Sequence, residues 1–346
     1  MLTIGIETSC DETSCAVLEG QNRIRSNIVS SSLLRHVPYG GIVPEIASRH
    51  CLEQIDFVFS QALKQARVKA KDCALVAVTE GPGLIGSLLV GVCFAKALSY
   101  GLGVPLVAVN HLDAHLESAF ISNEGKFKGV LSSRKPARYV GLLVSGGHTL
   151  LTYHVKNKVK KLGETVDDAA GEAYDKVAKI LGLGYPGGPV IDRLSREGNP
   201  RAIAFTKPKQ SQRFGFSFSG IKTAVLYYVE KQKKRGISPS AFKTMQKDIA
   251  ASFQHAVVQW LVEKTLDAAE VQRVKDIVVG GGVSANSLLR ERLAAEGLLR
   301  GITTHFPHLS LTNDNAVMIA RRGVDLYKRK QWADWTLAAD PNLKMV

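Results

Sequence analysis

The sequence lacks the features of secreted and membrane proteins. Its five cysteines are an odd number with no Cys-x-x-Cys pair, so no disulfide framework is expected and the thiols are predicted to be reduced. No basic and apolar leader precedes the strand-like opening segment 2–6. The longest uncharged run, 81–95, is too short for a bilayer, which needs about 20 residues. These absences predict a cytoplasmic protein without a membrane anchor.

Acidic residues are also scarce relative to basic ones. The 45 Lys and Arg exceed the 31 Asp and Glu, which gives a net charge of +14. A phosphate backbone favours such an excess through counterion release, so a nucleic acid is the favoured partner and an acidic protein surface the alternative. Hydrophobic residues make up 45% of the 346 residues and charged residues 22%, which excludes a disordered chain and predicts roughly two domains.

Two histidines, His111 and His115, follow a strand-like run at a spacing that places both imidazoles on one helix face. Such a pair supplies half of a divalent-metal site, and a third ligand must then come from elsewhere in the chain. The alternative is a helix whose histidines are capped or partly exposed. Asp314, which precedes an apolar helix, is either the N-cap of that helix or the missing carboxylate.

A strand-turn-strand pattern occurs at 2–18 and again at 139–153, which predicts a duplicated fold with a cleft between its halves. The first turn is rich in hydroxyls and carboxylates. Asp11 and Glu12 in this turn are candidates to hold a cation or accept a proton, and the alternative is an acidic, exposed loop. The second turn, 145–148, is rich in glycine, so its backbone can approach a ligand closely.

Two glycine-rich segments follow predicted strands. The first, 81–86, matches G-x-G-x-x-G, but Pro82 removes an amide from the phosphate cradle and Asn110 stands where a ribose-binding acid is expected. We therefore expect its glycines to allow close packing of a helix on a strand. The second segment, 280–286, leads into a Ser-capped helix and leaves room for a flat nucleoside that Asn286 could hydrogen-bond.

Charged residues cluster in the second half of the chain. Thr165 and Asp168 predict a capping box at a helix start. Asp168, Glu172 and Asp175 would then share one helix face and repel one another unless a cation, a sugar hydroxyl or a protonated partner lies against them. From 200 to 240, basic and aromatic residues alternate, which suits phosphate contact with base stacking or, equally, a surface helix whose Phe residues face the core.

Together these motifs resemble a known family. The turns at 7–13, 145–148 and 280–286 are similar to those of the actin, sugar kinase and heat-shock chaperone superfamily, whose α/β fold consists of duplicated ribonuclease H-like halves. Within that superfamily, the chain resembles the TsaD type of tRNA threonylcarbamoyltransferase. The motifs that carry the resemblance run in order along nearly the whole chain: Glu7-Thr8-Ser9-Cys10-Asp11-Glu12-Thr13, Gly81-Pro82-Gly83-Leu84, His111-x-x-x-His115, Val144-Ser145-Gly146-Gly147-His148, Asp168-x-x-Gly171-Glu172-Ala173-x-Asp175-Lys176, Tyr185-Pro186-Gly187-Gly188 and Gly281-Gly282-Val283-x-Ala285-Asn286.

The resemblance implies two actin-like halves. The N-terminal half is expected at 1–115, completed by the C-terminal helix at about 313–330. The C-terminal half, with helical insertions, is expected at 116–312. The basic segment 121–138, which Gly and Pro interrupt, is predicted to be a linker or a surface loop.

The resemblance also implies an activity. The threonylcarbamoyl group of L-threonylcarbamoyladenylate is expected to pass to the exocyclic amine of the adenosine 3′ of the anticodon, in tRNAs that read codons beginning with adenine, with release of AMP. One divalent ion, iron with zinc or magnesium as alternatives, is expected at His111, His115 and Asp314. Asp11 or Glu12 is expected to take the proton of the amine. The adenylate site is expected at these residues: Leu143, Val144, Ser145, Gly146, Gly147, Asp175, Gly188, Asp192 and Asn286. The expected partners are tRNA, a TsaB-like paralogue and a TsaE-like ATPase.

Two other classes of function are alternatives. A nucleotide-switched, chaperone-like ATPase has the same expected fold, and it would couple ATP turnover to a protein partner rather than to RNA. A metallopeptidase is less favoured, because His111-Leu112-x-x-His115 lacks the Glu that H-E-x-x-H uses as general base.

Overall fold

A computed structural model of the chain describes residues 1–121, 135–206 and 212–345. The chain divides into two compact units: unit 1 consists of Met1–Lys135 and Pro307–Val346, and unit 2 consists of Pro136–Phe306. The units therefore change at 135/136 and 306/307, whereas the sequence placed the changes at 115/116 and 312/313. The difference at the first boundary arises because residues 118–120 still pack on helices of unit 1. Most of the predicted linker at 121–138 lies outside the described residues.

Unit 1 is built on a five-stranded sheet with the strand order β3-β2-β1-β4-β5. The antiparallel pairs are β1 with β2 and β2 with β3, and the parallel pairs are β1 with β4 and β4 with β5. The strands are β1 Leu2–Glu7, β2 Glu12–Glu19, β3 Arg23–Ser31, β4 Leu75–Gly81 and β5 Leu106–Asn110. The turn between β1 and β2 therefore lies where three strands of the sheet reach their ends.

Unit 2 repeats this topology in a second five-stranded sheet, with the order β10-β9-β6-β7-β8. The antiparallel pairs are β6 with β7 and β7 with β8, and the parallel pairs are β6 with β9 and β9 with β10. The strands are β6 Arg138–Val144, β7 Thr149–Val155, β8 Lys158–Glu164, β9 Asp276–Gly280 and β10 Thr303–His305. The predicted duplication of ribonuclease H-like halves is thereby confirmed.

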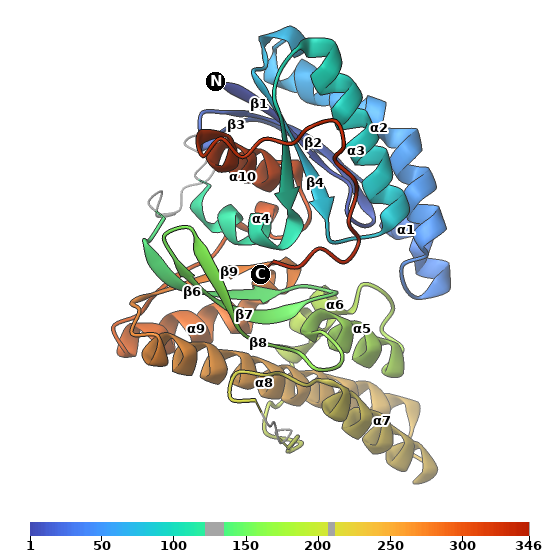
Figure 1. Cartoon of the computed structure of the whole chain (residues 1–346). Coiled ribbons are helices and arrows are strands. Elements are labelled where there is room, and N and C mark those ends of the chain that lie inside the picture. The colour runs from blue at the N-terminus through green and yellow to red at the C-terminus, as the bar shows by residue number, and fades with distance from the viewer. Residues whose placement is uncertain (122–134, 207–211, 346) are drawn as a thin grey trace. The chain divides into compact units, whose positions relative to one another are not determined.

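Helices cover both faces of the sheet in unit 1 (Figure 1). Alternate residues of β4 explain why: Leu75 and Ala77 pack in one apolar cluster with helix α10, whereas Val76 and Val78 pack in another with α2 and α3. The helices are α1 Leu33–His36, α2 Pro44–Ala66, α3 Ile85–Leu102, α4 His111–Glu117 and α10 Ala316–Lys328, with short 3-10 turns η1 Val37–Tyr39, η2 Ala70–Asp72, η3 Ser118–Phe120 and η5 Leu309–Leu311.

The core of unit 2 forms between its sheet and the long helix α8. Ser238 caps α8, since its Oγ accepts a hydrogen bond from Ala241 N. Phe214, Phe216 and Phe218 belong to this core and are not exposed stacking platforms, whereas Tyr227 of the same segment is exposed. Lys207 and Lys209 lie outside the described residues. The helices are α5 Ala170–Ile180, α6 Gly187–Ser195, α7 Ser219–Lys234, α8 Pro239–Val271 and α9 Ser287–Leu299, with the 3-10 turn η4 Gly282–Ala285.

Helix α3 is the one helix of the described chain that is long and apolar enough to cross a membrane, with a mean hydropathy of 1.6. It packs on β4 and α2 of unit 1. Lys96 in its middle donates a hydrogen bond to the carbonyl oxygen of Leu337, 2.9 Å away. Length and composition alone are weak evidence for a membrane span, because the core helix of a soluble protein passes the same test.

Two glycines allow α10 to pack directly on the sheet of unit 1. A Cβ atom on Gly5 of β1 would lie 2.2 Å from the carbonyl oxygen of Ala316, and one on Gly323 of α10 would lie 2.4 Å from the Cβ of Ala77. Both distances are far below van der Waals contact, so any side chain at these positions displaces the helix or the strand. The first turn of α10 is therefore held against β1.

We predict that Gly5→Ala lowers the free energy of unfolding by about 1–3 kcal/mol, because the added methyl group overpacks the contact with α10. Denaturant titration of the purified variant measures this loss. The matched control is Gly41→Ala, at a position where an added Cβ meets nothing within 4 Å. Equal stability of the two variants would contradict the tight packing of α10 on β1.

Candidate functional site

The structure brings together the three side chains predicted to bind a metal. The Nε2 atoms of His111 and His115 lie 3.1 Å apart. A carboxylate oxygen of Asp314 lies 3.0 Å from Nε2 of His115 and 3.5 Å from Nε2 of His111. Ligands at about 2.0–2.2 Å from one ion are separated by about 2.9 Å in octahedral and about 3.4 Å in tetrahedral geometry. The three distances fit donors that surround one small divalent cation.

Local sequence explains how two of these ligands are placed. Asn110 ends β5 and caps α4, because its Oδ1 accepts hydrogen bonds from Leu112 N and Asp113 N. The histidines then stand one turn apart on one face of α4. Asp314 does not cap α10, since the cap is Asn315, whose Oδ1 accepts a hydrogen bond from Met318 N. Asp314 is therefore not the N-cap of α10, and its carboxylate lies near the histidines, as the alternative interpretation required.

Glu7 contacts His111 on the side of the ring opposite the metal-binding nitrogen, and the sequence did not predict this role. Its carboxylate is fully buried at the end of β1 and accepts hydrogen bonds from Ser9 N at 2.6 Å and Thr79 Oγ1 at 2.5 Å. The Nδ1 atom of His111 lies 3.1 Å from the same carboxylate. A proton on Nδ1 that is donated to Glu7 leaves the Nε2 lone pair of His111 free for a metal. The available signal was a charged residue that ends an otherwise apolar strand.

The electrostatics of this cluster favour a bound cation. Burial lowers the pKa of His111, but the carboxylates of Glu7 and Asp314 outweigh burial and raise that pKa to about 9. Burial raises the pKa of Glu7, yet the charge and the hydrogen bond of His111 outweigh it and hold the pKa below its usual value. The Nδ1 atom of His115 is buried and has no hydrogen-bond partner in the described chain. Two negatively charged carboxylates therefore lie beside two imidazoles, and a divalent cation at the imidazole nitrogens would balance the negative charge.

Glu12, the first residue of β2, and Asp11, the last residue of the turn before it, lie close to the same cluster. Burial, followed by the negative charges of Asp314 and Asp11, raises the pKa of Glu12 well above its usual value. The backbone carbonyl of Asp11 accepts hydrogen bonds from the backbone N–H and the hydroxyl of Ser32. The turn is thereby fixed to the start of α1, and its carboxylates are half-buried rather than on a fully exposed loop.

Ion pairs join α4, which carries the two histidines, to α10, which begins just after Asp314. Asp113 of α4 lies 2.5 Å from a guanidinium nitrogen of Arg322 of α10. Glu117, also on α4 and buried, pairs with Lys135 and lies 3.7 Å from Arg321. The acids at positions 113 and 117 therefore hold α10 to α4 on the same turns that present the two histidines.

In unit 2, the glycine-rich turn after β6 has an exposed backbone. Two hydrogen bonds close the turn. Ser145 N donates to the carbonyl oxygen of His148 at 2.8 Å, and His148 N donates to Ser145 Oγ at 3.1 Å. Gly146 and Gly147 are exposed, and the side chains of Leu143 and Val144 are buried in the sheet. Any ligand at this turn would therefore meet the backbone of Leu143 and Val144, not their side chains.

The remaining predicted adenylate residues form a hydrogen-bonded group in unit 2. Asp175 of α5 accepts a hydrogen bond from Gly187 N, 2.7 Å away, and burial raises the pKa of its carboxyl. Asp192 of α6 accepts hydrogen bonds from the hydroxyl of Ser287 and from Gln254, at 2.8 and 3.1 Å. Gln254 was not predicted, because it lies in the apolar stripe of α8 and its sequence context suggests core.

Asn286 has a structural role in addition to any contact with a ligand. Its Nδ2 donates to Gln254 Oε1 at 2.8 Å, and its Oδ1 accepts from Leu289 N at 3.0 Å. Asn286, rather than the serine expected from the sequence, is therefore the N-cap of α9. Its Nδ2 also donates to the hydroxyl of Tyr174 at 3.4 Å, so what remains for a ligand is the second lone pair of Oδ1.

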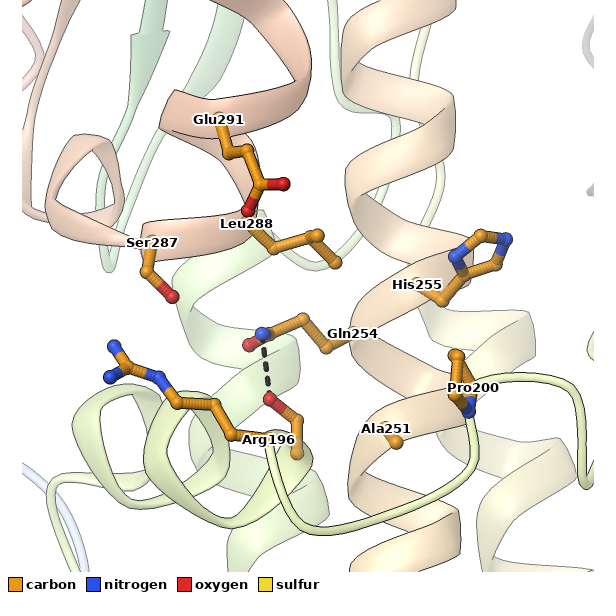
Figure 2. A pocket seen from close by; sticks show the side chains of 9 residues that line it. Arg196, Pro200, Ala251, Gln254, His255, Ser287, Leu288 and Glu291 are labelled. Atoms are coloured by element: carbon orange, nitrogen blue, oxygen red, sulfur yellow. Dashed lines mark hydrogen bonds between the residues drawn. The ribbon is translucent and has the colours of Figure 1, made fainter.

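A pocket of about 480 Å³ adjoins this group (Figure 2). Its walls come from the end of α6, the middle of α8 and the start of α9. The view shows Arg196, His255 and Glu291 around the opening and Gln254 between them, with a hydrogen bond to Ser195. The residues that line it are Ser195, Arg196, Pro200, Ala251, Gln254, His255, Ser287, Leu288 and Glu291.

The acidic stripe predicted at 168–175 is only partly formed. Helix α5 begins at Ala170, so Asp168 precedes the helix, and the hydroxyl of Thr165 donates to the carbonyl of Asp168 instead of forming a capping box. Lysines pair with two of the three acids: Lys176 and Lys222 lie 2.6 and 2.9 Å from the carboxylate of Asp168, and Lys176 lies 2.7 Å from that of Glu172. Burial raises the pKa of Asp168, and these two lysines outweigh burial and lower it. Lysine is therefore the protonated partner of Asp168 and Glu172, whereas burial and the charge of Glu172 raise the pKa of Asp175.

Comparison with known proteins agrees with the motifs. The family model of TsaD, tRNA N6-adenosine threonylcarbamoyltransferase, matches residues 23–321. The chain is 48% identical over 347 residues to the tRNA N6-adenosine threonylcarbamoyltransferase of Thermosipho africanus, with 100% of each chain covered. It is 50% identical over 343 residues to that of Thermodesulfovibrio yellowstonii, with 98% of each covered.

Solved structures agree with the fold. A crystal structure of full-length HypF in the phosphate- and nucleotide-bound form superposes with a TM-score of 0.59 at 14% identity, over 96% of this chain and 47% of that one. The HypF of T. kodakarensis gives a TM-score of 0.57 at 14% identity, over 95% and 48%. The chain thus spans about half the length of these HypF chains, and the likeness concerns the fold alone. From its relatives of similar length, the chain belongs to the tRNA N6-adenosine threonylcarbamoyltransferase family.

Proposed function

We propose that this acyltransferase uses L-threonylcarbamoyladenylate as donor and modifies the adenosine 3′ of the anticodon in tRNAs that read codons beginning with adenine. The observation that carries the proposal is the His111, His115 and Asp314 cluster, which stands beside the carboxylates of Glu12 and Asp11. The relatives' names give the acceptor as adenosine N6 of tRNA. The net charge of +14 suits a polyanionic substrate of this kind.

His111, His115 and Asp314 would hold the divalent ion, with Glu7 orienting His111 through its Nδ1 proton. Iron is the favoured ion, and zinc and magnesium are the alternatives; two imidazoles with one carboxylate suit iron or zinc better than magnesium. When bound, the ion supplies Lewis-acid stabilisation of negative charge on phosphate or carbonyl oxygens.

In the transfer, the N6 amine attacks the carbamoyl carbon, the bond from that carbon to the phosphate oxygen breaks, and AMP leaves. The amine must lose a proton, and a nearby carboxylate is the acceptor. Glu12 is the better candidate, because burial raises the pKa of its carboxyl and so makes its carboxylate a stronger base. Asp11 is the alternative base in the same turn.

In unit 2, the adenylate would be bound by backbone and side-chain groups that the structure leaves accessible. The exposed turn at Gly146 and Gly147 offers backbone amides for the phosphate. Gly188, at the start of α6, and the carboxylates of Asp175 and Asp192 suit the ribose hydroxyls. The pocket beside Ser287 has the volume for a purine base.

The proposed protein partners are a TsaB-like paralogue and a TsaE-like ATPase, and the proposed location is the cytoplasm, where tRNA is modified. Ile85, Leu89 and Cys93 support a protein partner, because they form an exposed stripe on α3 at helical spacing. A partner with a matching apolar helix would cover it. We assign this stripe to the paralogue.

Reconstitution tests the function as a whole. The chain, both partners, tRNA and threonylcarbamoyladenylate are incubated, and the digested nucleosides are analysed by mass spectrometry. We expect threonylcarbamoyladenosine and an equal amount of AMP, with weak activity when the partners are omitted. AMP release without modified nucleoside would contradict the transfer. ATP hydrolysis that is unaffected by His111→Ala would favour the chaperone-like alternative, and new amino termini in a protein substrate would favour the peptidase.

Metal content tests the proposed ligands. His111→Ala and His115→Ala are each expected to lose most of the bound metal, because two remaining donors cannot hold a divalent ion against dialysis. Elemental analysis of the dialysed proteins measures the stoichiometry. His255→Ala, in unit 2, is the control and should keep the metal content of the parent. Parent stoichiometry in either of the first two variants would refute the assignment.

The pH dependence tests the base. Glu12→Gln should lower kcat by about 10²–10⁴-fold in the reconstituted system and leave the metal content unchanged. In the parent, kcat should rise with pH as Glu12 ionises, and that rise should disappear in the Gln variant. Asp11→Asn, the matched change one residue earlier, should keep both most of the rate and the rise. The reverse pattern would assign the base to Asp11.

A further inference from the structure

The end of the chain forms an extended strap, residues 331–345, that follows α10 and crosses unit 1 (Figure 1). Its first part is anchored at the edge of the sheet, where Ala333 N donates to the carbonyl of Leu106 at 2.8 Å. Lys96 of α3 donates to the carbonyl of Leu337, and Trp335 packs edge-on against Tyr100 with ring centroids 5.6 Å apart. The strap is therefore a fixed part of unit 1.

The second part of the strap lies against the loop that joins β4 to α3. Asp340 N donates to the carbonyl of Glu80 at 2.9 Å, and the carbonyl of Pro341 accepts from Gly83 N at 3.3 Å. A Cβ atom on Gly81 would lie 1.8 Å from the carbonyl oxygen of Asp340. Only glycine fits at position 81, so its role is to admit the strap rather than to pack α3 on β4 as predicted.

The strap ends at the helix that carries the histidines. The Nδ2 atom of Asn110 donates to the carbonyl of Lys344 at 3.0 Å. The other end of the same amide, Oδ1, accepts from Leu112 N and Asp113 N and so caps α4. Because an amide group is planar, the bond to Lys344 fixes the direction in which Oδ1 meets the first turn of α4. His111 is the first residue of that turn.

A second connection runs from the strap to the same imidazole. Gly83, which donates to Pro341, is followed by Leu84, whose N–H donates to the carbonyl of Ser9 at 2.7 Å. A Cβ atom on Gly83 would lie 2.3 Å from that carbonyl oxygen, so the two loops are in direct contact. The hydroxyl of Ser9 lies 3.2 Å from Nδ1 of His111. The strap thus reaches His111 through α4 and through the turn after β1.

We propose that the strap positions His111 for metal binding, with Asn110 as the positioning residue that connects the two. The inference rests on the proposed metal site and goes beyond it, because neither the strap nor Asn110 touches the donor atoms of the three ligands. Removing the strap frees the loop at 81–84 and the amide of Asn110. His111 then loses both connections through which the strap restrains it, the cap of α4 and the loop that holds the turn at Ser9. Metal binding must then order the ligands, which weakens it.

Truncation tests the strap. A variant that ends at Ala339 should bind Co²⁺ about 10- to 100-fold more weakly than the full chain, measured by competition with a chromogenic chelator. The visible absorption spectrum of the Co²⁺-loaded protein should also change, because it reports the arrangement of the ligands. The control ends at Met345 and keeps the amide carbonyl of Lys344 that Asn110 contacts. Thermal unfolding of both variants checks that unit 1 remains folded. Parent affinity and spectrum in a folded variant ending at Ala339 would overturn the inference.

A side-chain change gives an independent test that does not depend on the truncated chain folding. Asn110→Ser keeps an N-cap hydroxyl for α4, but the side chain is too short to cap the helix and reach Lys344 together. Positioning by the strap predicts weaker Co²⁺ binding, by about 10-fold or more, and the altered spectrum. Parent values in this variant would show that capping alone suffices and would overturn the role of Asn110. Ser238→Ala, which removes the cap of α8 in unit 2, is the matched control.

The two proposals fail in distinguishable ways. If His111→Ala retains Co²⁺ at the affinity of the parent, the metal site itself is misassigned. If His111→Ala loses Co²⁺ while the truncated chain and Asn110→Ser keep it, the metal site stands and the strap has no part in positioning it.

Discussion

The close packing of α10 on the first sheet is the constraint on which the metal cluster depends. Two glycines, Gly5 and Gly323, remove the side chains that would keep helix and sheet apart. Asp314 stands just before this helix, so the distance of its carboxylate from the histidines is set by how closely the helix approaches β1. The ion pair of Asp113 with Arg322 fixes the same helix against α4. A site of three donors thus depends on backbone contacts elsewhere in the unit.

The parts of the site that depend on local spacing could be predicted from the sequence. The histidine pair follows from helical periodicity, because residues four apart share a face whatever surrounds the helix. Asp314 could be named only as one of two alternatives, since its approach to α4 depends on packing between distant segments. Glu7 and Gln254 were not predictable in this way, because a single polar residue in an apolar strand or helix does not indicate what it contacts.

The fold was predicted more completely than the surfaces. The duplicated strand-turn-strand pattern predicted β1, β2, β6 and β7. The polar edge strands β3 and β8 were not predicted, because only part of each is buried and their apolar pattern is weak. The errors at Thr165 and Asp168 have a similar origin: a sequence that matches a capping box was used instead for an ion pair with Lys222. Local signals identify which residues are polar and not which partners satisfy them.

Unit 1 is assembled from both ends of the chain, and this connectivity determines when it can form during synthesis. The strands of its sheet leave the ribosome early, but α10 and the strap leave only after the whole of unit 2. Until then, one face of the first sheet lacks its covering helix and the histidines lack their carboxylate. The nascent N-terminal segment must therefore wait, with an apolar face uncovered, while unit 2 is free to fold first, which makes chaperone protection most valuable in that interval.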